Sequence, residues 1–378
     1  MMTSRERLLT ALRRGIPDRL PVTTHHIMPY WLDRYLDGIT YDAFFDRFGF
    51  DALRWTLPLK AEKGAIDDAA HGFTCNADWR VESEDVRGGE YRTTRYRIIT
   101  PQDTLTMEMQ ANEYTAWVSE RLIKRKQDID VLGRYLPVPI CDVEAVNSAA
   151  EAFGERGIVR GHIPGFDIYG QPGCWQDAAC LIGIEGLIMA TYDDPTWVHE
   201  LLGILSRRKA SFIRSLAGAR YDILELGGGD ASTTVISPRI FERFMAPYDA
   251  ALIAAAHEVD QRIVYHTCGG MMPILEQIAD MRPDAMETFT PPDMGGDTDL
   301  AEAKRRIGDK VCMIGGFDQF HFFTGCTPEQ TRAEVRRCFE AAGSGGGYIL
   351  SPSDHFFDAD PALVAAFAEE ARVCLYTG

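Results

Sequence analysis

The sequence repeats one unit along most of its length: a short apolar or β-branched run followed by a longer stretch with helical periodicity. Runs with strand character occupy residues 20–25, 52–57, 157–163, 222–227, 262–267, 284–289, 311–316 and 347–352. Helical patterns lie between most of them, and several open on proline, whose fixed φ suits a first helical turn. About eight strands that alternate with helices predict an α/β fold, a (β/α)8 TIM barrel.

An open, doubly wound sheet is the alternative fold. It would place a glycine-rich phosphate-binding turn after its first strand, and no such turn follows residues 20–25. The length of 378 residues allows one large domain with an insertion or two smaller domains, and we expect a single domain over residues 1–378. Residues 3–15 predict an N-terminal helix, with Thr3 or Ser4 as its N-cap and Gly15 at its end.

Residues 70–125 have a different pattern, in which polar residues alternate with β-branched and aromatic ones around Pro101-Gln102-Asp103. Alternation with a period of two is typical of strands that bury one face. We therefore expect β-hairpins here, inserted between the second and third strands of the barrel.

Charge and composition exclude several classes of protein. The formal net charge is −17, and no basic run is longer than Lys124-Arg125-Lys126, which argues against binding to nucleic acid. No stretch approaches the ~18 apolar residues of a membrane span, and the charged N-terminal segment does not resemble a secretory signal. Nine scattered cysteines argue against a disulfide framework and predict a reducing, cytoplasmic location.

The active site of a barrel lies at the carboxyl ends of its strands, so the residues at those ends can be considered together. Polar groups occur at nearly every one: His25, His26, Asp167, Tyr169, Glu225, Asp230, His266, Cys268, Glu287, Asp318, Asp354 and His355. Taken singly, Asp230 and Asp318 are better explained as capping or turn residues, and His162, inside a strand pattern, is expected in the core. Taken together, these groups predict one polar site at the mouth, the end of the barrel where the strands finish. Tyr30 could line an apolar pocket within it.

The segment Tyr265-His266-Thr267-Cys268-Gly269-Gly270 places a histidine and a cysteine at one strand end. Thiolate and neutral imidazole are zinc ligands, although an isolated H-x-C pair is common by chance. A catalytic zinc needs three protein ligands and an open position. The third ligand could be Asp354, His355 or Glu287.

Five segments resemble the uroporphyrinogen decarboxylase family: "RERLLTALRRGIPDRLPV", "ISPRIFERFMAPYDAALIAAAH", "VYHTCGGMMPILEQIADMRPDAMETFTPP", "RIGDKVCMIGGFD" and "GGGYILSPSDHFFDADP". The resemblance covers nearly the whole chain and implies a (β/α)8 barrel. Within the family, the chain is more similar to the cobalamin-dependent branch, the methylcobalamin:coenzyme M methyltransferases and their relatives. Where the decarboxylases have an arginine-rich "RQAGRYLP" stretch, this chain reads "THHIMPYWLDRYL". Uroporphyrinogen would therefore lack its main counter-charges.

The resemblance implies a zinc-dependent methyltransferase, with His266 and Cys268 as ligands and Asp354 at the position where the branch has a second cysteine. Methyl groups would pass between a small substrate and methylcobalamin on a separate corrinoid protein, because no D-x-H-x-x-G motif is visible in the chain. Glu287, Asp354 and His355 would be catalytic. The resemblance also implies a homodimer. Substrate binding would fall to His25, His26, Tyr30, Asp167, Tyr169, Glu225, Asp230 and Asp318.

Two other functions are compatible with the same residues. The first is a metal-independent decarboxylase or lyase of a smaller carboxylate, with Asp354 or Glu287 as general acid and His25 or His26 anchoring the substrate. The second is a binding protein that kept the barrel without the chemistry. The density of ionisable groups at the mouth argues against the binding protein, because buried charges cost stability unless they are paired or used.

Overall fold

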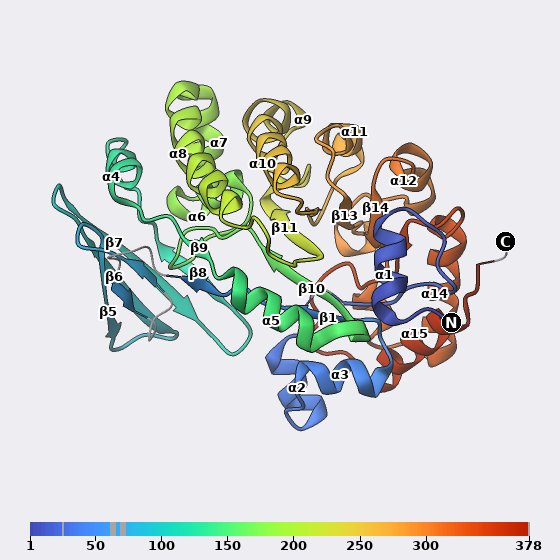
Figure 1. Cartoon of the computed structure of the whole chain (residues 1–378). Coiled ribbons are helices and arrows are strands. Elements are labelled where there is room, and N and C mark those ends of the chain that lie inside the picture. The colour runs from blue at the N-terminus through green and yellow to red at the C-terminus, as the bar shows by residue number, and fades with distance from the viewer. Residues whose placement is uncertain (25, 61–65, 69–72, 377–378) are drawn as a thin grey trace.

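The computed structural model of the chain describes residues 1–24, 26–60, 66–68 and 73–376. Its centre is a curled, parallel sheet (Figure 1). In spatial order the strands are β1 (Ala52–Trp55), β10 (Gly157–His162), β11 (Ile223–Gly227), β12 (Ile263–His266), β13 (Ala285–Thr288), β14 (Cys312–Gly315) and β15 (Tyr348–Ile349). Each strand follows its neighbour in chain order, so their carboxyl ends lie along one edge of the sheet.

The run at residues 20–25 does not form the predicted regular strand, and the described sheet has seven strands. Val22 makes an isolated parallel bridge to Leu350, next to β15. The same segment reaches the other edge of the sheet, because the Asp51 N–H, just before β1, donates to the Val22 carbonyl at 2.7 Å. Pro21 has no N–H to donate, which limits the ladder at this point. His25 lies outside the described residues.

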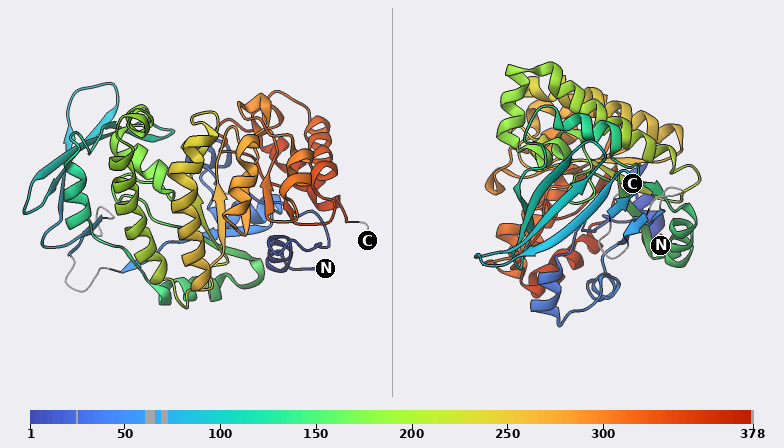
Figure 2. Two further views of the ribbon diagram at one scale, coloured as in Figure 1. Left: turned by 90° about the horizontal axis from the view of Figure 1, so that it is seen from above. Right: turned by 90° about the vertical axis from the view of Figure 1, so that its left-hand side faces the viewer.

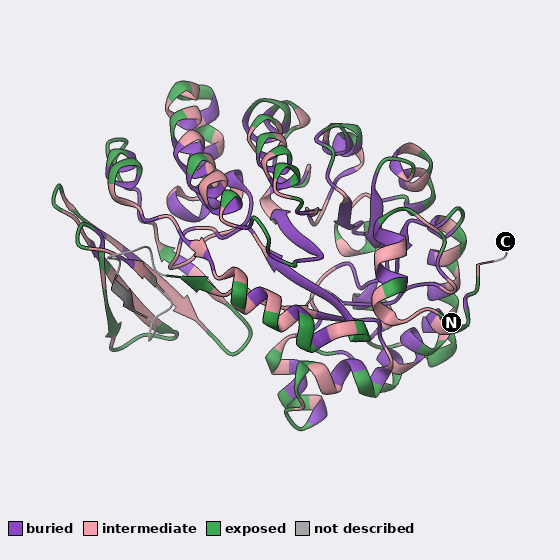
Figure 3. Ribbon diagram, viewed as in Figure 1, coloured by how far each residue is buried: buried purple, intermediate pink, exposed green. Residues whose placement is uncertain are grey.

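Helices follow most of the strands and cover the outside of the sheet (Figures 1 and 2). Their bounds are α1 (Ser4–Leu12), α2 (Pro29–Leu36), α3 (Tyr41–Phe48), α4 (Asp128–Tyr135), α5 (Val143–Phe153), α6 (Cys174–Ile182), α7 (Ile184–Asp193), α8 (Pro195–Arg214), α9 (Pro238–Ile240), α10 (Ala246–Glu258), α11 (Leu275–Asp280), α12 (Leu300–Ile307), α13 (Gln319–Phe322), α14 (Pro328–Ala342) and α15 (Pro361–Val373). Buried residues fill the strands and the helix faces turned toward them (Figure 3). Within the described part of the chain, no helix is long and apolar enough to cross a membrane.

Between β1 and β10 the chain forms antiparallel structure. The larger sheet contains β5 (Arg80–Val86), β6 (Arg92–Ile99), β7 (Thr104–Ala111) and β8 (Ala116–Glu120), joined in chain order. Two short pairs accompany it, β3 (Ile66–Asp68) with β4 (Phe73–Cys75) and β2 (Leu59–Lys60) with β9 (Ile140–Cys141). The larger sheet projects from the end of the molecule opposite both termini (Figure 2).

The turn between β7 and β8 packs back onto the rest of the molecule through Tyr114. Its ring centroid lies 4.7 Å from that of Tyr30 in α2 and 5.7 Å from that of Phe357, which follows β15. A hydrogen bond with Tyr30 raises the pKa of Tyr114 to about 12. The antiparallel sheet is thus attached to α2 and to the loop that follows β15.

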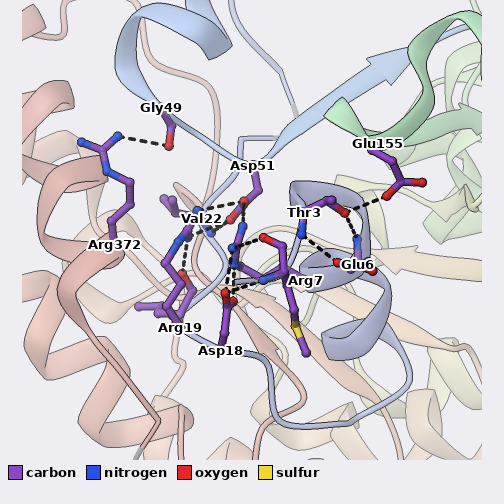
Figure 4. A network of polar contacts seen from close by, with 12 residues as sticks. Thr3, Glu6, Arg7, Asp18, Arg19, Val22, Gly49, Asp51, Glu155 and Arg372 are labelled. Carbon is purple, nitrogen blue, oxygen red and sulfur yellow. Dashed lines mark hydrogen bonds and ion pairs between the residues drawn. The ribbon is translucent and has the colours of Figure 1, made fainter.

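A polar network fixes the opposite end of the sheet (Figure 4). Asp51 is fully buried and accepts hydrogen bonds from Arg7 at 2.6 Å, from Arg19 at 3.0 Å and from the Val22 N–H at 3.0 Å. Thr3, one of the two N-cap residues expected from the sequence, caps α1 and forms a capping box with Glu6. The network joins α1, the Val22 segment and the start of β1.

Candidate active site

Three buried charged side chains meet inside the sheet: Arg160 of β10, Glu225 of β11 and Glu287 of β13. Arg160 donates to both oxygens of Glu287, at 2.9 and 2.5 Å, and to Glu225 Oε2 at 2.6 Å. The exposed fractions of the three side chains are 3%, 12% and 2%. A guanidinium group suits this role because its planar donors match carboxylate oxygens in pairs.

His266 of β12 joins this cluster through Glu287. Its Nδ1 lies 3.0 Å from Glu287 Oε1, because His266 and Glu287 are register partners on neighbouring strands. Burial alone would lower the pKa of His266. Hydrogen bonds with Cys268 and Glu287, and the negative charges of Glu225 and Glu287, outweigh that effect and raise the pKa well above its usual value. The two glutamates carry one more negative charge than Arg160 can balance. Protonation of His266 supplies the second positive charge, which is why its pKa is raised.

A cavity of about 480 Å³ opens beside the cluster. Its lining residues are His26, Tyr41, Trp55, His162, Gly170, Gln171, Pro172 and Glu225. The His26 ring stacks on Trp55 with centroids 4.7 Å apart and planes 7° apart, and the Arg160 guanidinium carbon lies 4.5 Å from the Trp55 ring centroid. The expectation that His162 is a core residue is therefore wrong, since its side chain reaches the cavity.

Both histidines of the cavity are held neutral. Burial lowers the pKa of His26 to about 4, against the opposing charge of Glu225. Burial also lowers the pKa of His162. A neutral imidazole offers one N–H donor and one acceptor nitrogen, so these walls are polar without being positively charged.

Asp354 and His355 lie in the loop after β15 and interact with each other. Asp354 Oδ1 lies 3.1 Å from His355 Nδ1, and the His355 ring centroid is 5.1 Å from that of His26. Burial would raise the pKa of Asp354, but the hydrogen bond and charge of His355, together with the charge of His266, lower it. The loop therefore lies near enough to His266 for the charge of its imidazole to act on Asp354.

The side-chain atoms that could bind a metal ion gather in a group that differs from the predicted ligand set of His266, Cys268 and Asp354. The ligand atoms of Glu225, His266 and Glu287 lie within 4.8 Å of one another, and in the described ranges neither Cys268 nor Asp354 joins such a group. Arg160, however, already binds both glutamates. Cys268 hydrogen-bonds with His266, and its sulfur lies next to Gly229, where an added Cβ would approach it to 2.8 Å.

Several predicted substrate-binding residues have structural partners. Asp167 forms a buried ion pair with Arg208 of α8. Asp318 caps α13 and lies 2.6 Å from His321 Nδ1, which agrees with its interpretation as a capping residue. Tyr30 packs against Tyr114, as described above. None of these three is among the described residues that line the cavity.

Asp230 and Tyr169 also lie off the cavity wall. The Asp230 N–H donates to Gln176 Oε1 at 3.2 Å, and burial raises the pKa of its carboxyl group. Tyr169 is half-buried against the core. Of the predicted substrate-binding residues, the structure therefore brings His26 and Glu225 to the cavity.

The loop that forms the opposite wall of the cavity is fixed from behind by α8. Lys209 is buried, pairs with Asp177 at 2.9 Å and donates to the Gln171 carbonyl at 2.8 Å. Arg208 donates to the Gly165 carbonyl at 2.7 Å. Gly170 has no room for a side chain, because a Cβ there would lie 1.8 Å from the Phe166 nitrogen. The wall is held in place before any ligand binds.

Arg160 was absent from the predicted site residues. It lies inside the strand pattern "GIVRGH" and not at a strand end. One signal in the sequence could have identified it, since arginine in an apolar strand is rarely buried without a partner.

Comparison with known proteins identifies relatives over most of the chain. The sequence model described as "Uroporphyrinogen decarboxylase (URO-D)" matches residues 108–373. A uroporphyrinogen decarboxylase from Thioalkalivibrio sulfidiphilus is 25% identical over 291 residues, which cover 73% of this chain and 77% of the relative. One from Pseudomonas syringae pv. syringae is 30% identical over 185 residues, covering 47% and 48%. A solved methyltransferase from Methanosarcina mazei has a TM-score of 0.63 at 16% identity and covers 98% of both chains, which indicates a shared fold.

Proposed function

Since the chain belongs to the uroporphyrinogen decarboxylase family, we propose that it is a zinc-dependent methyltransferase. It moves methyl groups between a corrinoid carried on a separate protein and a small molecule in the cavity. One observation carries the proposal: the buried chain from Arg160 through Glu287 to His266, which orients an imidazole that is hydrogen-bonded to Cys268. The fold shared with a protein named as a methyltransferase supports it.

In chemical type the donors suit zinc, although the ligand atoms of Cys268 and Asp354 lie outside the close group that His266 forms with the two buried glutamates. His266 and Cys268 would bind it with Asp354 as third ligand, and Glu287 and His355 are the other candidates for the third position. A carboxylate behind a histidine fixes the tautomer and raises the basicity of a metal-binding imidazole. Glu287 has that position at Nδ1 of His266. Bound zinc would lower the pKa of a group that occupies its open position.

The chain's own residues have three tasks in this reaction. Arg160 holds Glu287 in the orientation that fixes His266. Trp55 and Pro172 form walls of the cavity that would position the small molecule. Arg160 is bound at the Oε2 atom of Glu225. The other oxygen of this carboxylate can accept a hydrogen bond from the small molecule.

Metal analysis tests the proposal. We expect about one zinc per chain, the stoichiometry of a single catalytic site, and its loss in Cys268→Ser and His266→Ala with the fold retained by circular dichroism. Cys326→Ser is the matched control, because Cys326 is partly exposed and contacts Thr331. Transfer of the methyl group from methylcobalamin to an added thiolate, which forms a methyl thioether and releases cob(I)alamin, should depend on zinc and can be followed by absorbance. A folded protein that takes up no zinc from supplemented medium would contradict the proposal.

The second candidate is a metal-independent carboxy-lyase, which the names of the curated relatives favour. The described cavity lining contains no arginine or lysine, so a substrate with eight carboxylates would lack counter-charges. We expect no detectable CO₂ from uroporphyrinogen III. Release at a rate comparable to that of the relatives would favour this candidate over methyl transfer.

The resemblance also leads us to propose a homodimer. Sedimentation velocity of the purified protein tests this expectation. A monomer at micromolar concentration would rule it out.

A further inference from the structure

A second cavity, of about 200 Å³, lies between the end of α7 and the segment that joins α9 to α10. It shares no described lining residue with the cavity beside Arg160. Its floor is apolar, because Ile240 and Phe244 are 5% and 1% exposed. An apolar cavity of about 150 Å³ is large enough to hold a benzene ring. A small molecule with one flat ring therefore fits here.

Two arginines line this cavity from one side. Arg239 lies in α9, and Arg243 lies in the π-helical turn Phe241–Met245 that follows it. Both side chains are exposed, and over the residues that the structure describes neither guanidinium group has an ion-pair or hydrogen-bond partner. On α14, in contrast, Arg332 and Arg336 each pair with a glutamate at 2.6 Å. The two arginines at the cavity thus keep their donors available for a ligand.

The charge at this cavity is not balanced by its own walls. Its described lining contains no aspartate or glutamate. The guanidinium carbon of Arg243 lies 5.2 Å from the ring centroid of Phe244, which places the positive charge beside the apolar floor. Guanidinium groups bind carboxylates through two parallel hydrogen bonds. The electrostatics therefore favour a carboxylate over a neutral or cationic group.

The remaining wall offers an aromatic face. Tyr192, at the end of α7, is 71% exposed, and no ring of the described residues stacks on it. Aromatic rings gain energy by stacking in offset or edge-to-face arrangements. The π-helical turn that holds Arg243 is a rare element, and such turns occur frequently at functional sites.

We infer that this cavity binds a small organic anion in which a carboxylate is joined to a flat ring. The ring lies between Tyr192 and the apolar floor, and the carboxylate accepts hydrogen bonds from Arg239 and Arg243. The inference is independent of the proposed methyl transfer, because none of the proposed zinc ligands lines this cavity.

Three probes separate the contribution of the charge from that of the ring: benzoate, its neutral isostere benzamide, and acetate, which keeps the charge and lacks the ring. Dissociation constants come from saturation-transfer NMR titrations on the full chain at pH 7.5 and low ionic strength. Benzoate should bind at least about fivefold more tightly than benzamide, because only benzoate forms charge-assisted hydrogen bonds. It should also bind at least about fivefold more tightly than acetate, because acetate buries no ring. Equal affinity for benzoate and either of the other probes would overturn the inference.

Variants locate the binding. Arg239→Gln combined with Arg243→Gln should reduce the preference for benzoate over benzamide to about twofold or less. Arg87→Gln, which removes an exposed arginine from the antiparallel sheet, is the matched control and should leave the preference unchanged. An unchanged preference in the double variant would place benzoate elsewhere on the protein and overturn the inference.

Tyr192→Ala tests the aromatic wall. It should weaken benzoate and benzamide by a similar factor of about three, because both probes lose the same stacking partner. Unaltered affinity of both probes would contradict the proposed position of the ring. Each substitution replaces an exposed side chain, so the fold should be retained, and circular dichroism checks this.

Discussion

Arg160→Met is the most direct test of the site, because it removes one guanidinium group from two buried carboxylates. Charge centres about 4 Å apart attract by about 4 kcal/mol at an effective dielectric constant of ~20. Desolvation of the ions offsets much of that energy in the intact protein. In the variant the glutamates stay buried, at 12% and 2% exposure, without their partner. The expected loss is therefore the cost of breaking a buried pair, about 3–5 kcal/mol.

Calorimetric melting measures this loss. With an unfolding entropy of ~2.1 cal/mol/K per residue, a loss of that size lowers the melting temperature of the chain by about 4–6 °C. The loss should be larger at pH 8 than at pH 5. Without Arg160, burial raises the pKa of the glutamate carboxyl groups in the folded state. The stability associated with their protonation is present at low pH and is lost as pH rises through that pKa.

Matched variants separate the effect of the buried charges from the effect of replacing any arginine. Arg305→Met removes an exposed partner of Glu302, with 71% of the arginine side chain accessible, and should change the melting temperature by at most about 1 °C. Arg160→Met combined with Glu225→Gln and Glu287→Gln should recover part of the loss, because the buried charges are gone. Zinc content should also fall in Arg160→Met, since His266 loses its oriented partner. If Arg160→Met were no more harmful than Arg305→Met, the reasoning about the cluster would be refuted.

The remaining predictions concern other parts of the molecule. Burial raises the pKa of the Asp249 carboxyl group to about 6, although the hydrogen bond from Tyr265 acts in the opposite direction. The protonated carboxyl group therefore stabilises the folded state at low pH, and this stability is lost as pH rises through about 6. Asp249→Asn should add about 3 kcal/mol of stability at pH 8 and little at pH 4, measured by urea unfolding. Tyr114→Ala should speed amide exchange in α2, whereas Tyr91→Ala, on the same antiparallel sheet, should not. Asp51→Asn should lower the melting temperature by several degrees, because it weakens the buried network of Figure 4. An unchanged melting temperature would mean that this network contributes no net stability.

Local sequence was sufficient for features that depend on neighbouring residues. The capping box at Thr3 follows from side chains three positions apart. The alternation of strands and helices follows from hydrophobic periodicity, and the observed strands β10 to β15 fall within the predicted runs. Local pattern was insufficient at residues 20–25, where the segment makes one bridge in place of a ladder.

The same limit applies to residues at strand ends. A polar residue there has two common roles, one in the mouth and one in the turn or helix behind it. Asp318 and Glu287 have the same sequence signature, yet Asp318 caps α13 and Glu287 holds Arg160 and His266. The direction of each side chain decides between these roles, and that direction is set by packing.

The sequence by itself determined the strands β1 and β10 to β15 of the central sheet, the family likeness and the location of His266 and Cys268 at a strand end. Only the tertiary structure decided which charges meet. Arg160 lies 65 residues from Glu225 and 127 from Glu287, and the register of parallel strands brings the three together. Pairing across such distances depends on strand order and on burial, where a charge must find a partner. Local periodicity contains no information about either, so the cluster that orients His266 could be recognised only in the folded chain.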